Sequence, residues 1–191
     1  MNSISDNEIK EIVQRVLQQT GQASNPSPNP LPPSPPEPST KVVAIGSDHG
    51  GFEMKTALIE TLKELKYEPL DCGTYSKEAV DYPDFALAVA EQVRNGKAWR
   101  GIMIDGAGIG SCMVANKVPG IRAAMAYDYA SASNSREHNN ANVLTLGAGL
   151  IGLNQAKLIV KTWLSTEFAG GRHQPRVDKI GQVEKKYMKE G

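Results

Sequence analysis

The chain has 191 residues, with 21 basic and 21 acidic side chains and 40% hydrophobic content, which is enough for one buried domain with an added segment. The balanced charge and the few aromatic residues argue against nucleic acid as a partner, and no apolar run approaches the roughly 20 residues of a membrane span or the core of a secretory signal. Cys72 and Cys112 form no metal-binding pattern, and so few cysteines indicate a reducing, cytoplasmic setting. Together these features predict a cytoplasmic protein that binds neither membrane nor nucleic acid.

Residues 1–21 are predicted to form an amphipathic helix. Ser5 can cap its start with Glu8 three residues on, and Gly21 follows its last turn. One face carries the apolar residues Ile9, Ile12, Val13, Val16 and Leu17. A helix of this length is marginal alone in water, so we expect this face to bind a partner.

Residues 22–40 form a linker in which eight of nineteen residues are proline. Dense proline excludes helix and sheet and favours polyproline II at about 3.1 Å per residue, so the linker can span as much as ~60 Å. The alternative is that the helix folds back on its own domain or on a sister subunit.

From residue 41 onward, apolar strands alternate with helical patterns, and we treat 41–191 as one domain. Strands are predicted at 42–46, 68–71, 101–104, 122–126 and 142–146. Helices are predicted at 52–66, 83–95, 109–117, 129–137, 152–165 and 174–189. This alternation predicts an α/β fold: a five-stranded, parallel, doubly wound, Rossmann-like sheet with helices on both faces.

The stretch from Arg100 to Ser111 is the most informative part of the chain. A buried strand ends at Asp105, and Gly106, Gly108 and Gly110 then lead into a helix. Free N–H groups at a helix start favour a negative charge, and parallel sheets place ligands at the carboxyl ends of their strands. The glycine spacing fits neither a Walker loop nor a dinucleotide fingerprint. Asp105 is therefore either a site carboxylate or a cap for the following helix.

Other loops at the same sheet edge also carry reactive side chains. Asp48 and His49 follow the first strand, and Tyr82 lies in the second loop. His138 and Asn139 follow the fourth strand and its helix. Arg172 and Arg176, four residues apart, are suited to gripping a phosphate.

These segments together resemble type B ribose-5-phosphate isomerase and its relatives that act on hexose 6-phosphates. The resemblance is carried, in order, by Ile45–Phe52, Asp81–Pro83, Gly106–Gly110, Ala115–Lys117, Gly120–Ala123, Ser135–Asn139, Ala141–Leu144 and Gly170–His173. It implies aldose–ketose isomerisation through an enediolate, without metal or cofactor. It also implies a homodimer, or a dimer of dimers, whose sites are shared between subunits.

The resemblance also implies roles for individual residues. His138 would assist ring opening, with Asp48 and Tyr82 nearby. Asn139 would hold the oxyanion together with the backbone amides of Gly106, Ala107, Gly108, Ile109, Gly110 and Ser111. His49, Arg172 and Arg176 would bind the phosphate.

Three positions depart from the family pattern. Asp105 stands where the family has a catalytic cysteine, Ala107 where it usually has threonine, and Gly149 where it commonly has a phosphate-binding arginine. Cys112 lies seven residues beyond Asp105 in the predicted helix and is expected to pack in the core. We hypothesise that Asp105 is the base. An ordinary aspartate is a weak base, so burial would have to raise its pKa for this task.

The N-terminal helix and linker are similar in layout to the encapsulation peptides that direct enzymes into bacterial microcompartments. This implies that a shell protein or a neighbouring cargo enzyme buries the apolar face, and that the protein resides inside such a compartment. The competing interpretations are an isomerase of a different sugar phosphate, a sugar-phosphate-binding or scaffold protein that has lost turnover, and a flavodoxin-like nucleotide binder.

Overall fold

The computed structural model describes residues 10–11 and 41–187. The chain divides into two units, Met1–Glu37 and Pro38–Gly191. In the first unit, Lys10 and Glu11 are helical and exposed, and the predicted apolar face lies outside the described residues. No helix within the described ranges is long and apolar enough to span a bilayer.

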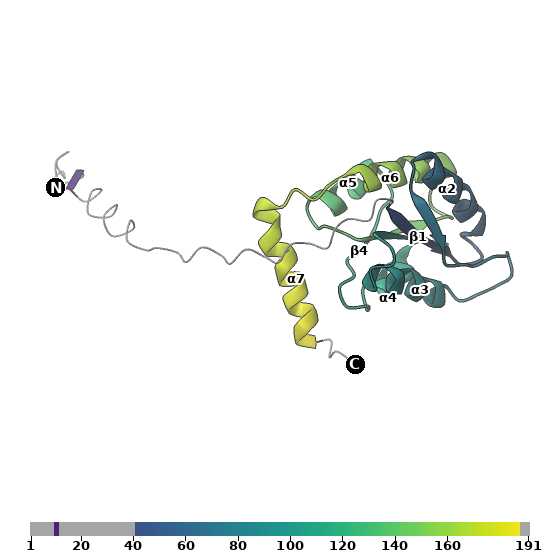
Figure 1. The fold of residues 1–191 in the computed structure, drawn as a ribbon, viewed down its shortest axis with the longest axis horizontal. Helices are drawn as coiled ribbons and strands as arrows, with labels where there is room; N and C mark the ends of the chain where they lie inside the picture. Colours follow the sequence, from purple (N-terminus) through teal and green to yellow (C-terminus); the bar gives the residue numbers. More distant parts are fainter. Residues whose placement is uncertain (1–9, 12–40, 188–191) are drawn as a thin grey trace, which may run out of the picture. The chain divides into compact units, whose positions relative to one another are not determined.

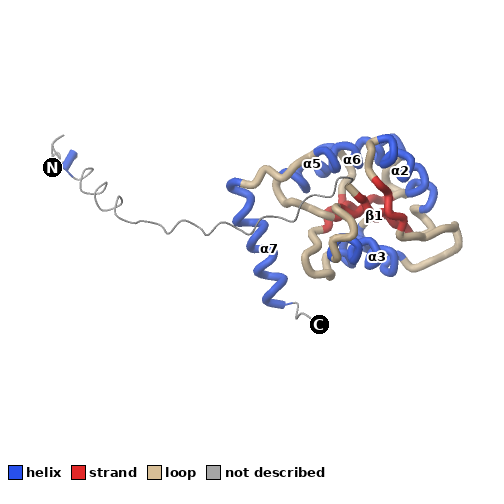
Figure 2. Tube along the Cα trace, in the orientation of Figure 1, coloured by secondary structure: helices blue, strands red, loops and turns tan. Residues whose placement is uncertain are grey.

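Five parallel strands form a single sheet in the order β2-β1-β3-β5-β4. Figure 2 colours the strands red. The strands are β1 (Val42–Ser47), β2 (Glu68–Asp71), β3 (Arg100–Asp105), β4 (Ala123–Met125) and β5 (Val143–Gly147). All six residues of β3 are buried, as expected for a central strand whose two faces are both covered.

Helices cover both faces of this sheet (Figure 1). One face packs against α2 (Phe52–Glu64), α5 (Tyr129–Glu137) and α6 (Leu153–Ser165) around a core that includes Leu58, Ile104 and Trp163. The other face packs against α3 (Tyr82–Arg94) and α4 (Ile109–Ala115) around Val89 and Met103. The doubly wound α/β fold predicted from the sequence is thereby confirmed.

The chain ends in a short 3-10 helix, η1 (Gly171–His173), and in α7 (Gln174–Tyr187). A side-chain contact ties α7 to the loop before β4, because the Gly120 N–H donates to Glu184 Oε2 at 2.8 Å. The sequence predicts α7 but not η1.

The strand order determines where a ligand site is expected. From β1 the chain moves outward to β2, and it then returns to add β3 on the opposite side of β1. Such a reversal leaves a crevice at the carboxyl ends of the two central strands, where open α/β sheets bind ligands. The loops after β1 and β3 therefore meet at this point.

Candidate active site

The Asp48 loop lies directly beside the glycine loop that follows β3. The Asp48 N–H donates to the Ile104 carbonyl oxygen at 3.1 Å, and Asp48 Oδ1 accepts from the Gly51 N–H at 2.9 Å. A Cβ on Gly50 would lie 3.4 Å from Asp48 Oδ1 and 4.0 Å from the Gly106 nitrogen. Asp48 is buried, so its carboxylate is fixed at the mouth of the glycine loop.

Asp105 is the last residue of β3 and only 4% exposed. Its Oδ1 accepts from the Ala107 N–H at 2.8 Å and from the Gly108 N–H. Its Oδ2 accepts from the Ser111 N–H at 3.1 Å and from Ser111 Oγ at 2.5 Å. The carboxylate thus caps α4, which was one of the two roles open on the sequence. Its role as a base stays a prediction.

This capping changes what the glycine loop can offer to a ligand. The predicted oxyanion donors include the N–H groups of Ala107, Gly108 and Ser111, and all three already donate to Asp105. A substrate oxygen in the loop must share these donors with the carboxylate or displace it.

The backbone of the glycine loop packs against β5. Gly108 has a φ of +77°, and a Cβ there would lie 2.9 Å from the Leu146 carbonyl carbon. Thr145 Oγ1 donates to the Gly108 carbonyl oxygen at 2.8 Å. Only glycine fits at residue 108, because a positive φ is costly for residues with a Cβ and because a Cβ would collide with the Leu146 backbone.

Tyr82, the first residue of α3, reaches the same loop. A Cβ on Gly110 would lie 2.5 Å from Tyr82 Cζ and 2.6 Å from the phenol oxygen. The phenol therefore lies directly on the Gly110 backbone. The structure brings Tyr82, Asp48 and Asp105 to one loop, as the sequence predicts.

His49 lies in the loop between β1 and α2, next to Asp48, and its ring contacts Val80 in the segment before α3. Its Nδ1 is 3.2 Å from the Val80 nitrogen and accepts its N–H. This contact links the β1 loop to the segment that carries Tyr82, and it leaves the exposed His49 ring at the surface.

Tyr127, for which the sequence predicted no role, and Gly149 also contact the glycine loop. The Tyr127 hydroxyl, from the loop after β4, donates to the Ala107 carbonyl oxygen at 3.2 Å. The Gly149 N–H donates to the Gly106 carbonyl oxygen at 2.9 Å, so the position without the expected arginine adjoins the glycine loop. A tyrosine directly after a predicted strand was a usable signal for Tyr127.

Cys112 does not supply a substitute nucleophile or base. It is half-buried in α4, and burial raises the pKa of its thiol, which keeps it protonated at neutral pH. Its Sγ lies 3.5 Å from the Ala123 carbonyl oxygen, in a packing position.

His138 and the two predicted phosphate-binding arginines belong to a second group of residues, built on α5, η1 and α7. The His138 ring stacks on His173 with centroids 4.2 Å apart and planes 8° apart. Arg172 Nε lies 3.4 Å from His173 Nε2. Burial first, and then the charges of His138, Arg172 and Arg176, lower the pKa of His173. His173 is therefore neutral at physiological pH.

Asn134, in the last turn of α5, joins the two predicted site residues that directly follow this helix. Asn134 Nδ2 lies 2.8 Å from His138 Nδ1, and Asn139 Nδ2 lies 3.4 Å from Asn134 Oδ1. Asn134 is not among the site residues predicted from the sequence, although its four-residue spacing from His138 places the two side chains on the same side of the helix end.

No hydrogen bond or ion pair among residues 41–187 joins the group around Asp105 to the group around His138. Nor do the residues in the described ranges include three or more His, Cys, Asp or Glu side chains grouped to hold a metal. The described part of the chain therefore keeps the two groups of predicted site residues separate.

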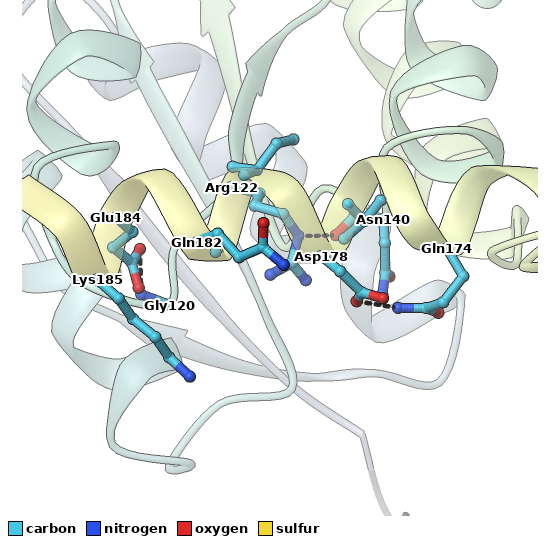
Figure 3. A pocket seen from close by; sticks show the side chains of 11 residues that line it. Gly120, Arg122, Asn140, Gln174, Asp178, Gln182, Glu184 and Lys185 are labelled. Atoms are coloured by element: carbon cyan, nitrogen blue, oxygen red, sulfur yellow. Dashed lines mark hydrogen bonds between the residues drawn. The ribbon is translucent and has the colours of Figure 1, made fainter. Parts of the chain in front are cut away.

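A polar groove of about 450 Å³ lies elsewhere, between α7 and the loop before β4 (Figure 3). In it, Arg122 Nε donates to the Asn140 carbonyl oxygen at 3.0 Å, and Gln174 Nε2 donates to Asp178 Oδ1 at 2.7 Å. Burial lowers the pKa of Arg122, which nevertheless stays charged. None of the predicted site residues lines this groove.

Known proteins that are similar to this chain in sequence and in structure point to the same family. The model of the family described as "Ribose/Galactose Isomerase" matches residues 43–180. The chain is 44% identical over 146 residues to the ribose-5-phosphate isomerase B of Escherichia coli, covering 76% of this chain and 98% of that protein. It is 42% identical over 146 residues to the D-erythrulose-4-phosphate isomerase of Pectobacterium atrosepticum, covering 74% and 94%. The solved structure of ribose-5-phosphate isomerase B from Clostridium thermocellum superposes with a TM-score of 0.75 at 54% identity, covering 76% of this chain and 99% of that one.

Proposed function

The chain belongs to the ribose/galactose isomerase family, and from this premise we propose that it interconverts ribose 5-phosphate and ribulose 5-phosphate. The observation that carries the proposal is the meeting of Asp48, Tyr82 and Asp105 on one glycine loop at the switch point of the sheet. Relatives matched over nearly their whole length bear the name of this reaction.

The reaction moves one proton between adjacent carbons. A base removes the C2 proton of the open-chain aldose while the C1 carbonyl oxygen gains a proton, giving an enediol or its anion. The proton then returns to C1, and the O2 hydroxyl loses its proton to become the ketone. The protein must supply a base and donors for the developing oxyanion.

We assign the base to Asp105. A carboxylate that accepts four hydrogen bonds must release one before it can take a carbon-bound proton. The Ser111 hydroxyl is the donor that can turn away by rotation about one bond, whereas the three N–H donors are fixed in the backbone. We expect substrate binding to turn this hydroxyl.

The second group supplies ring opening and phosphate binding in this proposal. His138 acts on the ring oxygen, Asn139 helps to hold the oxyanion, and Arg172 and Arg176 grip the phosphate together with His49. Because one chain keeps the two groups apart, we propose a homodimer, or a dimer of dimers, in which each site takes one group from each subunit.

The test is isomerisation of ribose 5-phosphate by the purified full-length protein, beside Asp105→Asn and Asp105→Cys. Loss of a positioned base is expected to lower kcat by about 10²–10⁴-fold in Asp105→Asn. Asp105→Cys is expected to restore part of the rate, since a thiolate can take the same proton. Near-full turnover by Asp105→Asn, with an unchanged unfolding temperature, would show that Asp105 is only a cap.

A different sugar phosphate is the main alternative to ribose 5-phosphate as the substrate. Gly149 stands beside the glycine loop where the resemblance implies an arginine for the phosphate, and one relative is named for a four-carbon ketose phosphate. Assays should therefore compare ribose 5-phosphate, erythrose 4-phosphate and hexose 6-phosphates. If the enzyme prefers another sugar phosphate, that sugar replaces ribose 5-phosphate as the proposed substrate. If the protein binds sugar phosphates but turns over none of them, the scaffold interpretation is favoured.

We further propose that the N-terminal helix, through Ile9, Ile12, Val13, Val16 and Leu17, directs the enzyme into a bacterial microcompartment within the cytoplasm. The family match begins at residue 43, so the helix and linker precede the catalytic domain. Deletion of residues 1–40 is expected to abolish co-assembly with shell proteins and to leave kcat unchanged. Unchanged co-assembly after the deletion would refute the targeting role.

A further inference from the structure

We propose that Asn134 is a positioning residue for His138, and that its amide fixes which ring nitrogen of His138 carries the proton. The inference rests on the proposed function, because it explains how His138 is prepared to act on a sugar ring. Asn134 lies in the last turn of α5 and His138 caps its C-terminal end four residues on, with Asn134 Nδ2 at 2.8 Å from His138 Nδ1.

The orientation of the Asn134 amide follows from its other neighbour. Asn139 Nδ2 approaches Asn134 at two oxygens, the side-chain Oδ1 at 3.4 Å and the main-chain carbonyl at 3.3 Å. An NH₂ group only donates, so Asn134 Oδ1 is the accepting end and Asn134 Nδ2 is the donating end of the amide. The three side chains form a directed chain from Asn139 through Asn134 to His138.

A neutral imidazole has one donor and one acceptor nitrogen. Because Nδ1 accepts from Asn134, the proton of neutral His138 resides on Nε2. The nearest carboxylate oxygen, Glu137 Oε1, lies 3.8 Å from Nε2, which is longer than a hydrogen bond. The N–H at Nε2 is thus presented as a donor for a substrate oxygen.

The ring plane is fixed by a separate contact. The buried His173 imidazole lies parallel to His138 at 4.2 Å, so a flip of the His138 ring must slide against this face. Asn134 therefore selects the tautomer and His173 holds the plane.

This arrangement suits ring opening of a furanose. As the C1–O4 bond breaks, the O1 hydroxyl proton leaves to a base and the ring oxygen receives a proton from a donor. An Nε2–H aimed at that oxygen stabilises the charge that develops on it. The opposite tautomer would present a lone pair to the same oxygen and repel it.

The experiment is nitrogen NMR of the histidine rings at pH 8, with the His138 signals assigned through His138→Gln. In the full-length wild type, His138 is expected to carry its proton on Nε2. In Asn134→Asp, a carboxylate of the same shape can only accept, so the proton is expected to move to Nδ1. The matched control, Asn95→Asp at the exposed end of α3, should leave the His138 signals unchanged.

The same variants are then assayed with ribose 5-phosphate. Asn134→Asp is expected to lower kcat/KM by about tenfold or more, because a misplaced donor forfeits part of the acid–base contribution, whereas Asn95→Asp should match the wild type. A wild-type His138 protonated on Nδ1, or no change of tautomer in Asn134→Asp, would overturn the assignment. A tautomer change in a protein that isomerises no sugar phosphate would uphold the positioning role and defeat the proposed function.

Discussion

At the scale of single residues, Gly110 is the position where a small change should act on one side chain. Gly110→Ala places a Cβ 2.5 Å from Tyr82 Cζ, and the tyrosine is expected to swing away because it is the flexible partner. We expect kcat/KM to fall to the level of Tyr82→Ala, and the double variant to lose little more, as measured by a double-mutant cycle.

The control for this prediction is Gly152→Ala, where an added Cβ meets open space. It should retain wild-type activity. Additive losses in the Gly110 and Tyr82 variants would show that the glycine matters for another reason than room for the phenol.

His173 predicts a pH dependence of stability. Its pKa is lowered in the folded protein by burial and by neighbouring positive charge, so the unfolded chain binds the proton more readily. The free energy of unfolding should therefore decline as the pH falls below about 6.5, the unfolded value. Thermal unfolding of the wild type and of His173→Phe, which keeps an aromatic ring but cannot titrate, should show a smaller acid loss in the variant. Equal losses would contradict the prediction.

Residue roles were only partly predictable from sequence. The chemistry-bearing residues at the strand ends, Asp48 and Asp105, follow from the position of glycine after apolar runs. The bond from Asp105 to Ser111 depends on how a turn closes, and the Asn134 contact depends on rotamers. Neither is encoded in spacing alone.

At the scale of elements, Arg100 secures the end of α6 against β3. It is only 2% exposed, and its Nη1 donates to the carbonyl oxygens of Trp163 at 2.8 Å and Leu164 at 3.0 Å. The positive charge also suits the negative end of the helix dipole. Arg100→Met should destabilise the fold by about 2–4 kcal/mol in chemical denaturation, because buried carbonyls lose charged donors.

The control is Lys63→Met, which removes an exposed pair with Glu60. A change below about 0.5 kcal/mol is expected there. Similar losses at both positions would mean that Arg100 contributes no more than a surface charge.

The elements themselves were largely predictable, and the differences have local causes. The predicted strand 122–126 is reduced to Ala123–Met125 because the Arg122 N–H donates to the Asn142 side chain at 2.7 Å. The predicted helix 52–66 ends at Glu64, since Lys66 takes a positive φ of 64°. Neither a side-chain hydrogen bond to the backbone nor a positive φ at one residue leaves much trace in hydrophobic patterning.

At the scale of the whole molecule, the proposed dimer with shared sites predicts complementation between variants. A heterodimer of Asp105→Asn and His138→Ala subunits, purified through two different tags, would contain one site with both defects and one with neither. Its activity should be about half that of the wild-type dimer. Activity no higher than that of the two parent variants would place each complete site within one chain.

The capping of α4 by Asp105 also bears on the thermodynamics of ligand binding. A turn that holds its own anion is ordered as the chain folds, so its conformational entropy is lost then rather than on ligand capture. Amide hydrogen exchange at Ala107, Gly108 and Ser111 should therefore be slow in the free protein and change little with substrate. The ligand then meets an ordered turn, and the heat of binding reports on the ligand's own contacts together with the Ser111–Asp105 hydrogen bond that it releases.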